Sequence, residues 1–91
     1  MTDTEELFLH TKPAKILIHL NNPSRDNYPS QIAQDVDSTY SHTARTINRL
    51  EDHNLAQSHR KGRRKQVELT EQGKKTAETL STLIHQLRQL D

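Results

Sequence analysis

The sequence predicts one small, mainly α-helical domain that carries a single β-hairpin. Three observations predict this fold class. Apolar residues recur at the spacing of a helix face in several segments, capping residues stand before those segments, and Gly62 separates two strand-like runs. Because 91 residues can bury only a modest core, we expect a partner to add stability.

Residues 1–10 form an acidic lead-in, which we expect to be a short helical arm or a frayed end. Its apolar residues are Leu7, Phe8 and Leu9. A first helix follows, with Thr11 as its N-cap and Pro13 in its first turn. The apolar residues of this helix are Ala14, Ile16, Leu17, Ile18 and Leu20, and it ends at Asn21, Asn22 and Pro23.

A loop of turn-forming residues leads into a second helix. Ser30, which follows Pro29, is expected to cap this helix, and residues 31–36 are expected to form it. Its apolar face holds Ile32, Ala33 and Val36. The dipeptide 27–28 could add a third strand to the later hairpin.

A third helix follows a tight turn formed by Asp37 and Ser38. Thr39 is its expected N-cap, and the helix runs to about His53. Asn54 then takes a position where helices often need a left-handed residue, which Asn tolerates well. Two helices joined in this way are typical of a helix-turn-helix, which presents its second helix to DNA.

The hairpin and a last helix complete the chain. Residues 55–60 and 65–69 are the predicted strands, and Leu55, Val67 and Leu69 supply their core face. Thr70 caps a long helix from Glu71 to about Leu90. The predicted fold is therefore a winged helix-turn-helix, with a small β-hairpin wing. We expect a single domain, in which residues 1–10 are an N-terminal arm, 11–70 the winged-helix core and 71–91 a C-terminal dimerisation helix.

The third helix has two unlike faces. Thr43, Ala44, Ile47 and Leu50 share the inner side at 100° per residue. The residues that we expect to contact DNA are Thr39, Tyr40, Ser41, His42, Arg45, Asn48 and Arg49. Arg pairs with guanine and Asn with adenine through two hydrogen bonds, so this face could read base edges. The alternative is a solvated face without a ligand, and Tyr40 could point either to the core or to a phosphate.

Positive charge is concentrated in the middle of the chain. The net charge is +1, but residues 1–37, 38–70 and 71–91 carry −3, +4 and 0. Lys and Arg at a hairpin tip can neutralise phosphates or enter the minor groove. The wing residues that we expect to contact DNA are His59, Arg60, Lys61, Arg63, Arg64 and Lys65. The alternative is an exposed turn that charge merely keeps soluble.

The stretches QIAQDVDSTYSHTARTINRLEDHNL and VELTEQGKK resemble MarR-type winged-helix transcriptional regulators, including small archaeal members. The matching motifs are Arg49-Leu50-Glu51 and Leu69-Thr70-Glu71-Gln72-Gly73, and the likeness covers roughly residues 13–80. It implies a DNA-binding regulator in which Ser41 and Arg45 point outward and Arg63 contacts DNA. Lys61 stands where the family commonly has an Asp, so the usual ion pair with that Arg is absent. Family members use further helices for an effector pocket, and we do not expect such an effector here.

The last helix carries a leucine seam. Leu80, Leu83, Leu87 and Leu90 follow a 3, 4, 3 spacing, Ile84 widens the stripe, and Gly73 and Thr76 extend it backward. We expect its first half to cover the core of the domain. Its second half, aided by Leu7 to Leu9, is the expected interface of a symmetric homodimer. Such a dimer would hold two third helices about 34 Å apart and read a pseudo-palindromic site.

Composition argues against several other functions. The chain has no cysteine, and its six histidines lack metal-ligand spacing, so we predict no metal site and no cofactor. His42 and His59 are better explained as DNA contacts. We identify no nucleophile with a neighbouring base and no Gly-rich phosphate loop, so we do not expect an enzyme. No apolar run is long enough to span a membrane, and we expect a cytoplasmic protein.

The leading hypothesis is a sequence-specific double-stranded-DNA-binding transcriptional regulator that represses as a homodimer. One alternative is a non-specific architectural nucleic-acid-binding protein, which would spread basic charge over several faces. Another is a protein-interaction module whose leucine face binds a different protein. Such a module would not need the charge on the third helix and the wing.

Overall fold

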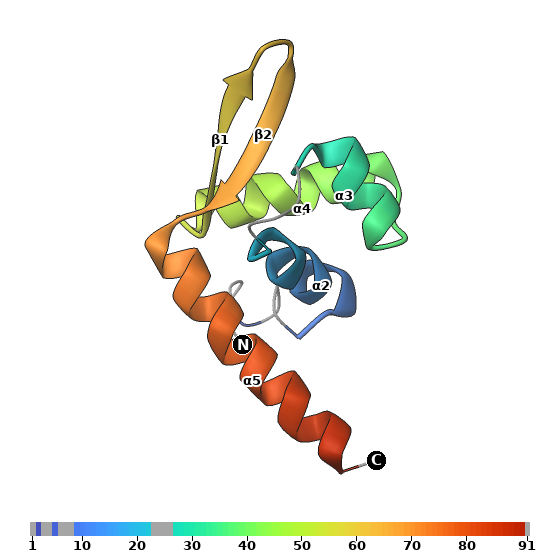
Figure 1. Ribbon diagram of the computed structural model, residues 1–91, viewed down its shortest axis with the longest axis vertical. Helices are drawn as coiled ribbons and strands as arrows, with labels where there is room; N and C mark the ends of the chain where they lie inside the picture. Colours follow the sequence, from blue (N-terminus) through green and yellow to red (C-terminus); the bar gives the residue numbers. More distant parts are fainter. Residues whose placement is uncertain (1, 3–4, 6–8, 23–26, 91) are drawn as a thin grey trace.

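The computed structural model describes residues 2, 5, 9–22 and 27–90. Its elements are α2 (Thr11–Leu20), α3 (Pro29–Asp35), α4 (Tyr40–Asp52), β1 (Ala56–Lys61), β2 (Arg64–Leu69) and α5 (Glu71–Gln89). The predicted order of elements is confirmed, and the fold is a winged helix-turn-helix (Figure 1). Within the described ranges, no helix is both long and apolar enough to cross a membrane.

The hydrophobic core gathers around α2, which lies between α5 and the α3–α4 pair (Figure 1). Its fully buried large side chains come from α2, α3, α4 and β2, and include Ile16, Leu17, Ile32, Leu50 and Val67. Burying each such side chain contributes about 1.5–3 kcal/mol. The core therefore fixes the orientation of α4 and of the base of the hairpin.

The wing is a two-stranded antiparallel hairpin in which Ala56 pairs with Leu69 and Lys61 with Arg64. Only Gly62 and Arg63 remain unpaired at the tip, and Gly62 has a φ of +67°. A positive φ at the first central residue is typical of a type II′ turn. Because the turn is this tight, both strands extend one residue closer to the tip than predicted.

Two predicted helix starts are wrong. The N-cap of α2 is His10 rather than Thr11, and the N-cap of α3 is Tyr28 rather than Ser30. Neither the His10 nor the Tyr28 side chain forms a capping hydrogen bond with a backbone N–H of the helix that it precedes. Pro29 begins α3 because its fixed φ fits the first helical position, where the missing N–H is no loss.

The other predicted caps are confirmed. Thr39 accepts a hydrogen bond from the backbone N–H of His42 at 3.1 Å, and Thr70 accepts one from Gly73 at 3.0 Å. Asn54 has a φ of +60°, as expected at the end of α4. These caps define the ends of α4 and the start of α5.

Residues 27–28 do not form the third strand that the sequence allowed. The carbonyl of Asn27 accepts one hydrogen bond from the N–H of Val67 at 2.9 Å, but the sheet of the described residues has two strands. One hydrogen bond holds the segment beside β2 but is not enough to make it a strand of the sheet. Of the predicted arm and first loop, Leu7, Phe8 and Pro23 lie outside the described residues.

Gly73 allows α5 to approach the end of α4. A Cβ atom built on Gly73 would lie 1.9 Å from the carbonyl oxygen of Leu55, so only glycine fits. Gly73 and Ala77 are buried in the domain itself. Gly73 therefore lies in the part of the α5 face that covers the core, as expected for the first half of this helix.

Candidate nucleic-acid interface

The helix-turn-helix depends on a tight turn between α3 and α4. Asp37 has a φ of +56°. Its N–H donates to the carbonyl of Gln34 at 3.2 Å, and the N–H of Ser38 donates to the carbonyl of Ala33 at 2.9 Å. This pair of bonds is a Schellman motif, in which the left-handed position is usually Gly. Here Asp37 takes it, so the turn holds a strained residue directly before the cap of α4.

The inner face of α4 packs into the core. Thr43, Ile47 and Leu50 are buried as predicted, while Ala44 is half-buried. Thr46 is also buried, which the sequence did not indicate. Its hydroxyl donates to the carbonyl of His42 at 3.0 Å, and this bond inside the helix allows a polar side chain to lie against the core.

The opposite face of α4 is open. Of the residues predicted there, Thr39, Tyr40, Ser41, Arg45 and Asn48 are exposed, and His42 and Arg49 are half-buried. Tyr40 is 59% exposed, so its side chain points away from the core. This face offers guanidinium, amide and hydroxyl groups to a ligand, and base edges in a major groove bind such groups.

Five of the six charged or polar residues predicted on the wing fall into two groups. Within the part of the chain that the structure describes, Arg60, Lys61 and Arg63 are exposed and form no ion pair. His59 lies 3.8 Å from Glu68, and Lys65 lies 3.7 Å from Glu51. The unpaired cations therefore cluster at the tip of the hairpin.

Glu51 links α4 to the wing. One of its carboxylate oxygens accepts a hydrogen bond from the Ser58 hydroxyl at 2.5 Å and lies 3.7 Å from Lys65 Nζ. The sequence identified Glu51 only as part of a motif. Its partners lie on both strands, so their approach depends on the register of the hairpin.

The Arg64 side chain contacts the segment that precedes α3. Its guanidinium lies 4.7 Å from the centre of the Tyr28 ring, which is the geometry of a cation–π contact. This contact and the bond between Val67 and Asn27 join β2 to the start of α3. Both α3 and α4 are thus tied to the wing.

The hairpin projects beyond α3 and α4, at the opposite end of the molecule from the C-terminal end of α5 (Figure 1). On one side of it, a shallow hollow of about 390 Å³ is lined by Ser58, His59, Arg60, Arg63 and Lys65. Glu51, near the end of α4, contacts Ser58 and Lys65 of the wing, so the end of α4 lies beside the hairpin that carries the exposed cations. A rigid polyanion could contact both.

The leucine seam of α5 leaves the domain as it runs toward the C-terminus. Leu80 packs against the core and Ile84 is half-buried, whereas Leu83, Leu87 and Leu90 are 49%, 52% and 82% exposed. Leu9 is also 70% exposed.

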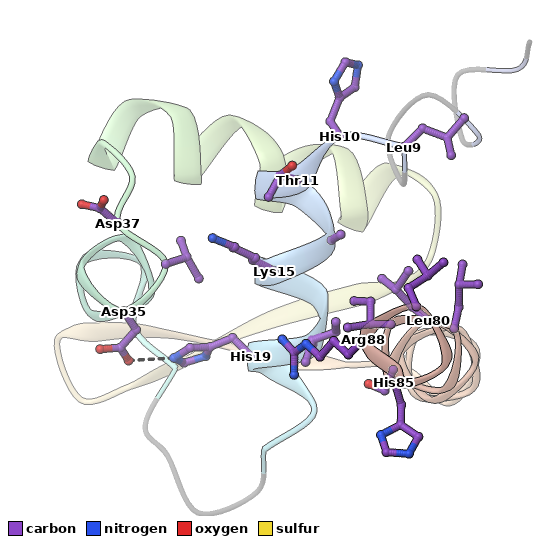
Figure 2. Close-up of a pocket in the computed structure, with 17 residues that line it drawn as sticks. Leu9, His10, Thr11, Lys15, His19, Asp35, Asp37, Leu80, His85 and Arg88 are labelled. Carbon is purple, nitrogen blue, oxygen red and sulfur yellow. Dashed lines mark hydrogen bonds and ion pairs between the residues drawn. The ribbon is translucent and has the colours of Figure 1, made fainter. Parts of the chain in front are cut away.

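A groove of about 890 Å³ lies between α2 and α5. Leu9 and Leu80 lie on its wall near α5, while His19 and Asp35, which form a 2.7 Å hydrogen bond, lie near α3 (Figure 2). The C-terminal half of α5 therefore presents an apolar face beside a groove.

The described residues contain no group of three or more His, Asp or Glu side chains that could hold a metal ion.

The fold is similar to those of several solved proteins. The crystal structure of AF1382 from Archaeoglobus fulgidus is 25% identical, with a TM-score of 0.81 over 93% of this chain and 97% of that chain. A DNA complex of Staphylococcus aureus MepR is 20% identical, with a TM-score of 0.77 over 94% of this chain and 73% of that chain. The transcriptional regulator SlyA is 20% identical, with a TM-score of 0.82 over 97% of this chain and 63% of that chain.

The sequence itself matches no family model and no curated protein. MepR and SlyA are MarR-family regulators, so the predicted resemblance to this group is confirmed at the level of the fold. The chain spans less than two thirds of SlyA.

Proposed function

We propose that this protein is a sequence-specific, double-stranded-DNA-binding transcriptional regulator that acts as a homodimer. One observation carries the proposal: α4 exposes Arg45 and Asn48 in the same module whose wing exposes the cations Arg60, Lys61 and Arg63. A surface that only contacts solvent would not need a polar helix face and a basic wing in the same module. MepR, which shares the fold, has been solved bound to DNA.

The exposed face of α4 is proposed to lie in the major groove. Arg45 would read a guanine and Asn48 an adenine through paired hydrogen bonds, while the hydroxyls of Tyr40 and Ser41 would hold phosphates. The tip cations of the wing would bind the adjacent backbone or minor groove. Sequence preference therefore comes from α4, and most of the non-specific affinity comes from the wing.

The exposed leucines of α5 are proposed to form the dimer interface. Leu83, Leu87 and Leu90 expose apolar surface that a second copy of the same helix would cover. A twofold dimer would place two α4 helices about 34 Å apart, one turn of DNA. The dimer would then occupy a pseudo-palindromic site in a promoter and exclude the transcription machinery.

Selection of bound fragments from random duplexes tests the proposal. We expect a twofold repeat whose half-sites are about one DNA turn apart. An Arg45→Ala, Asn48→Ala double variant serves as the control, because it removes the base-reading groups and keeps the wing. If the unaltered protein enriches no motif but still retains duplexes, it is a non-specific architectural protein and the proposal is wrong.

A further inference from the structure

We propose that Lys12 is a positioning residue, which holds the α3–α4 turn and so sets the pose of the recognition helix. Its Nζ donates to the carbonyl of Val36 at 2.8 Å and also to the carbonyl of Asp37. Lys12 lies in the first turn of α2, more than twenty residues away in the sequence. This inference rests on the proposed function, because it names a residue that prepares α4 for DNA.

The two carbonyls that Lys12 binds need a partner. Carbonyls in the last turn of a helix have no N–H to pair with inside that helix, and a cation near this end also interacts well with the helix dipole. Val36 is the C-cap of α3, and Asp37 is the left-handed residue that follows it. The ammonium therefore stabilises a conformation that Asp37 would not readily adopt alone.

The turn transmits this constraint directly to α4. Only Ser38 and Thr39 separate Asp37 from the first residue of α4, and Thr39 is the N-cap of that helix. A change in the backbone angles of Asp37 would redirect α4 as a whole. Lys12 itself is half-buried, with its ammonium directed at backbone carbonyls, so it is poorly placed to bind a phosphate.

The first test uses the free protein and needs no DNA. Lys12→Met keeps the aliphatic stem but removes the ammonium, and Lys15→Met is the matched control, since Lys15 is an exposed lysine one turn later on α2. We expect amide hydrogen exchange at Asp37 and Ser38 to be about tenfold faster in Lys12→Met and unchanged in Lys15→Met. We expect Lys12→Arg, which keeps a cationic donor, to restore slow exchange. Unchanged exchange in Lys12→Met would overturn the inference.

The second test measures affinity for the selected duplex as a function of salt. Lys12→Met should bind about tenfold more weakly with an unchanged salt slope, whereas Lys61→Met should lower the slope by about one. Lys15→Met, which alters an exposed position of the same helix, should leave both the affinity and the salt slope unchanged. A lower slope in Lys12→Met would show a phosphate contact and overturn the inference. If no duplex is selected, the proposed function fails, and the exchange test alone still decides the role of Lys12.

Discussion

At the scale of single residues, Arg45 and Arg63 are proposed to do different work. Arg45→Ala should cost about 1–3 kcal/mol of binding free energy on the selected site and relax the base preference at one position. Arg63→Ala should weaken binding to all duplexes evenly and reduce the salt slope by about one, because it removes a phosphate contact. Competition binding with point-mutated duplexes at several salt concentrations measures both. Equal effects of the two variants on all sequences would contradict the assignment.

Gly73 gives a prediction about stability. In an ordinary helix, replacing Gly by Ala stabilises by about 1 kcal/mol. Here the added Cβ atom would lie 1.9 Å from the carbonyl oxygen of Leu55, so backbone must move and we expect Gly73→Ala to destabilise by about 1–3 kcal/mol. Denaturant unfolding measures the change, and Gln72→Ala at the exposed neighbouring position is the control. A more stable Gly73→Ala protein would show that the close approach of α5 is wrong.

Helical periodicity predicted the exposed side of α4 correctly at Arg45 and the buried side at Ile47, because 3.6 residues per turn fixes which positions share a face. It did not predict Glu51 or Lys12. The partners of these residues lie on other elements, and nothing in the spacing of one helix shows which neighbour its charged side chains will meet. Thr46 was missed because its hydroxyl is satisfied inside the helix.

At the scale of elements, α5 makes a prediction about assembly. Leu83→Ser with Leu87→Ser should convert the proposed dimer to a monomer, because both side chains are about half exposed in the single chain and the interface would lose its apolar surface. The monomer should stay folded, since neither residue is buried. Sedimentation equilibrium gives the mass, with the exposed Gln86→Ser as the control. An unchanged mass in the double variant, or a monomeric unaltered protein, would contradict this role for α5.

The elements also show what local sequence can specify. Thr39 and Thr70 were predicted as caps from their residue type and position, and in the structure each hydroxyl accepts a hydrogen bond from a backbone N–H three residues later. Thr11 and Ser30 have the same chemistry, but α2 and α3 begin at Thr11 and Pro29 without a side-chain cap. Packing of α2 in the core and the fixed φ of Pro29 determine those starts, and neither follows from capping preference alone.

At the scale of the whole molecule, the separation of charge predicts a strong dependence on salt. The tip cations and the polar face of α4 would engage about 6–10 phosphates in a dimer, so affinity should fall by about 10³–10⁵ between 50 and 200 mM salt. Filter binding or fluorescence anisotropy over this range measures the slope. A slope near zero would mean that few phosphates are bound and would contradict an electrostatic interface.

The fold predicts which end of the molecule meets DNA, and this is the central claim. The most direct measurement is an NMR titration of the isotope-labelled protein with a short duplex. We expect the shifted amides to lie in the exposed half of α4, from Tyr40 to Arg49, and at the wing tip, from Arg60 to Arg64, while α2 and the C-terminal half of α5 stay unchanged. Shifts confined to α2 and α5, with α4 and the wing unaffected, would contradict it.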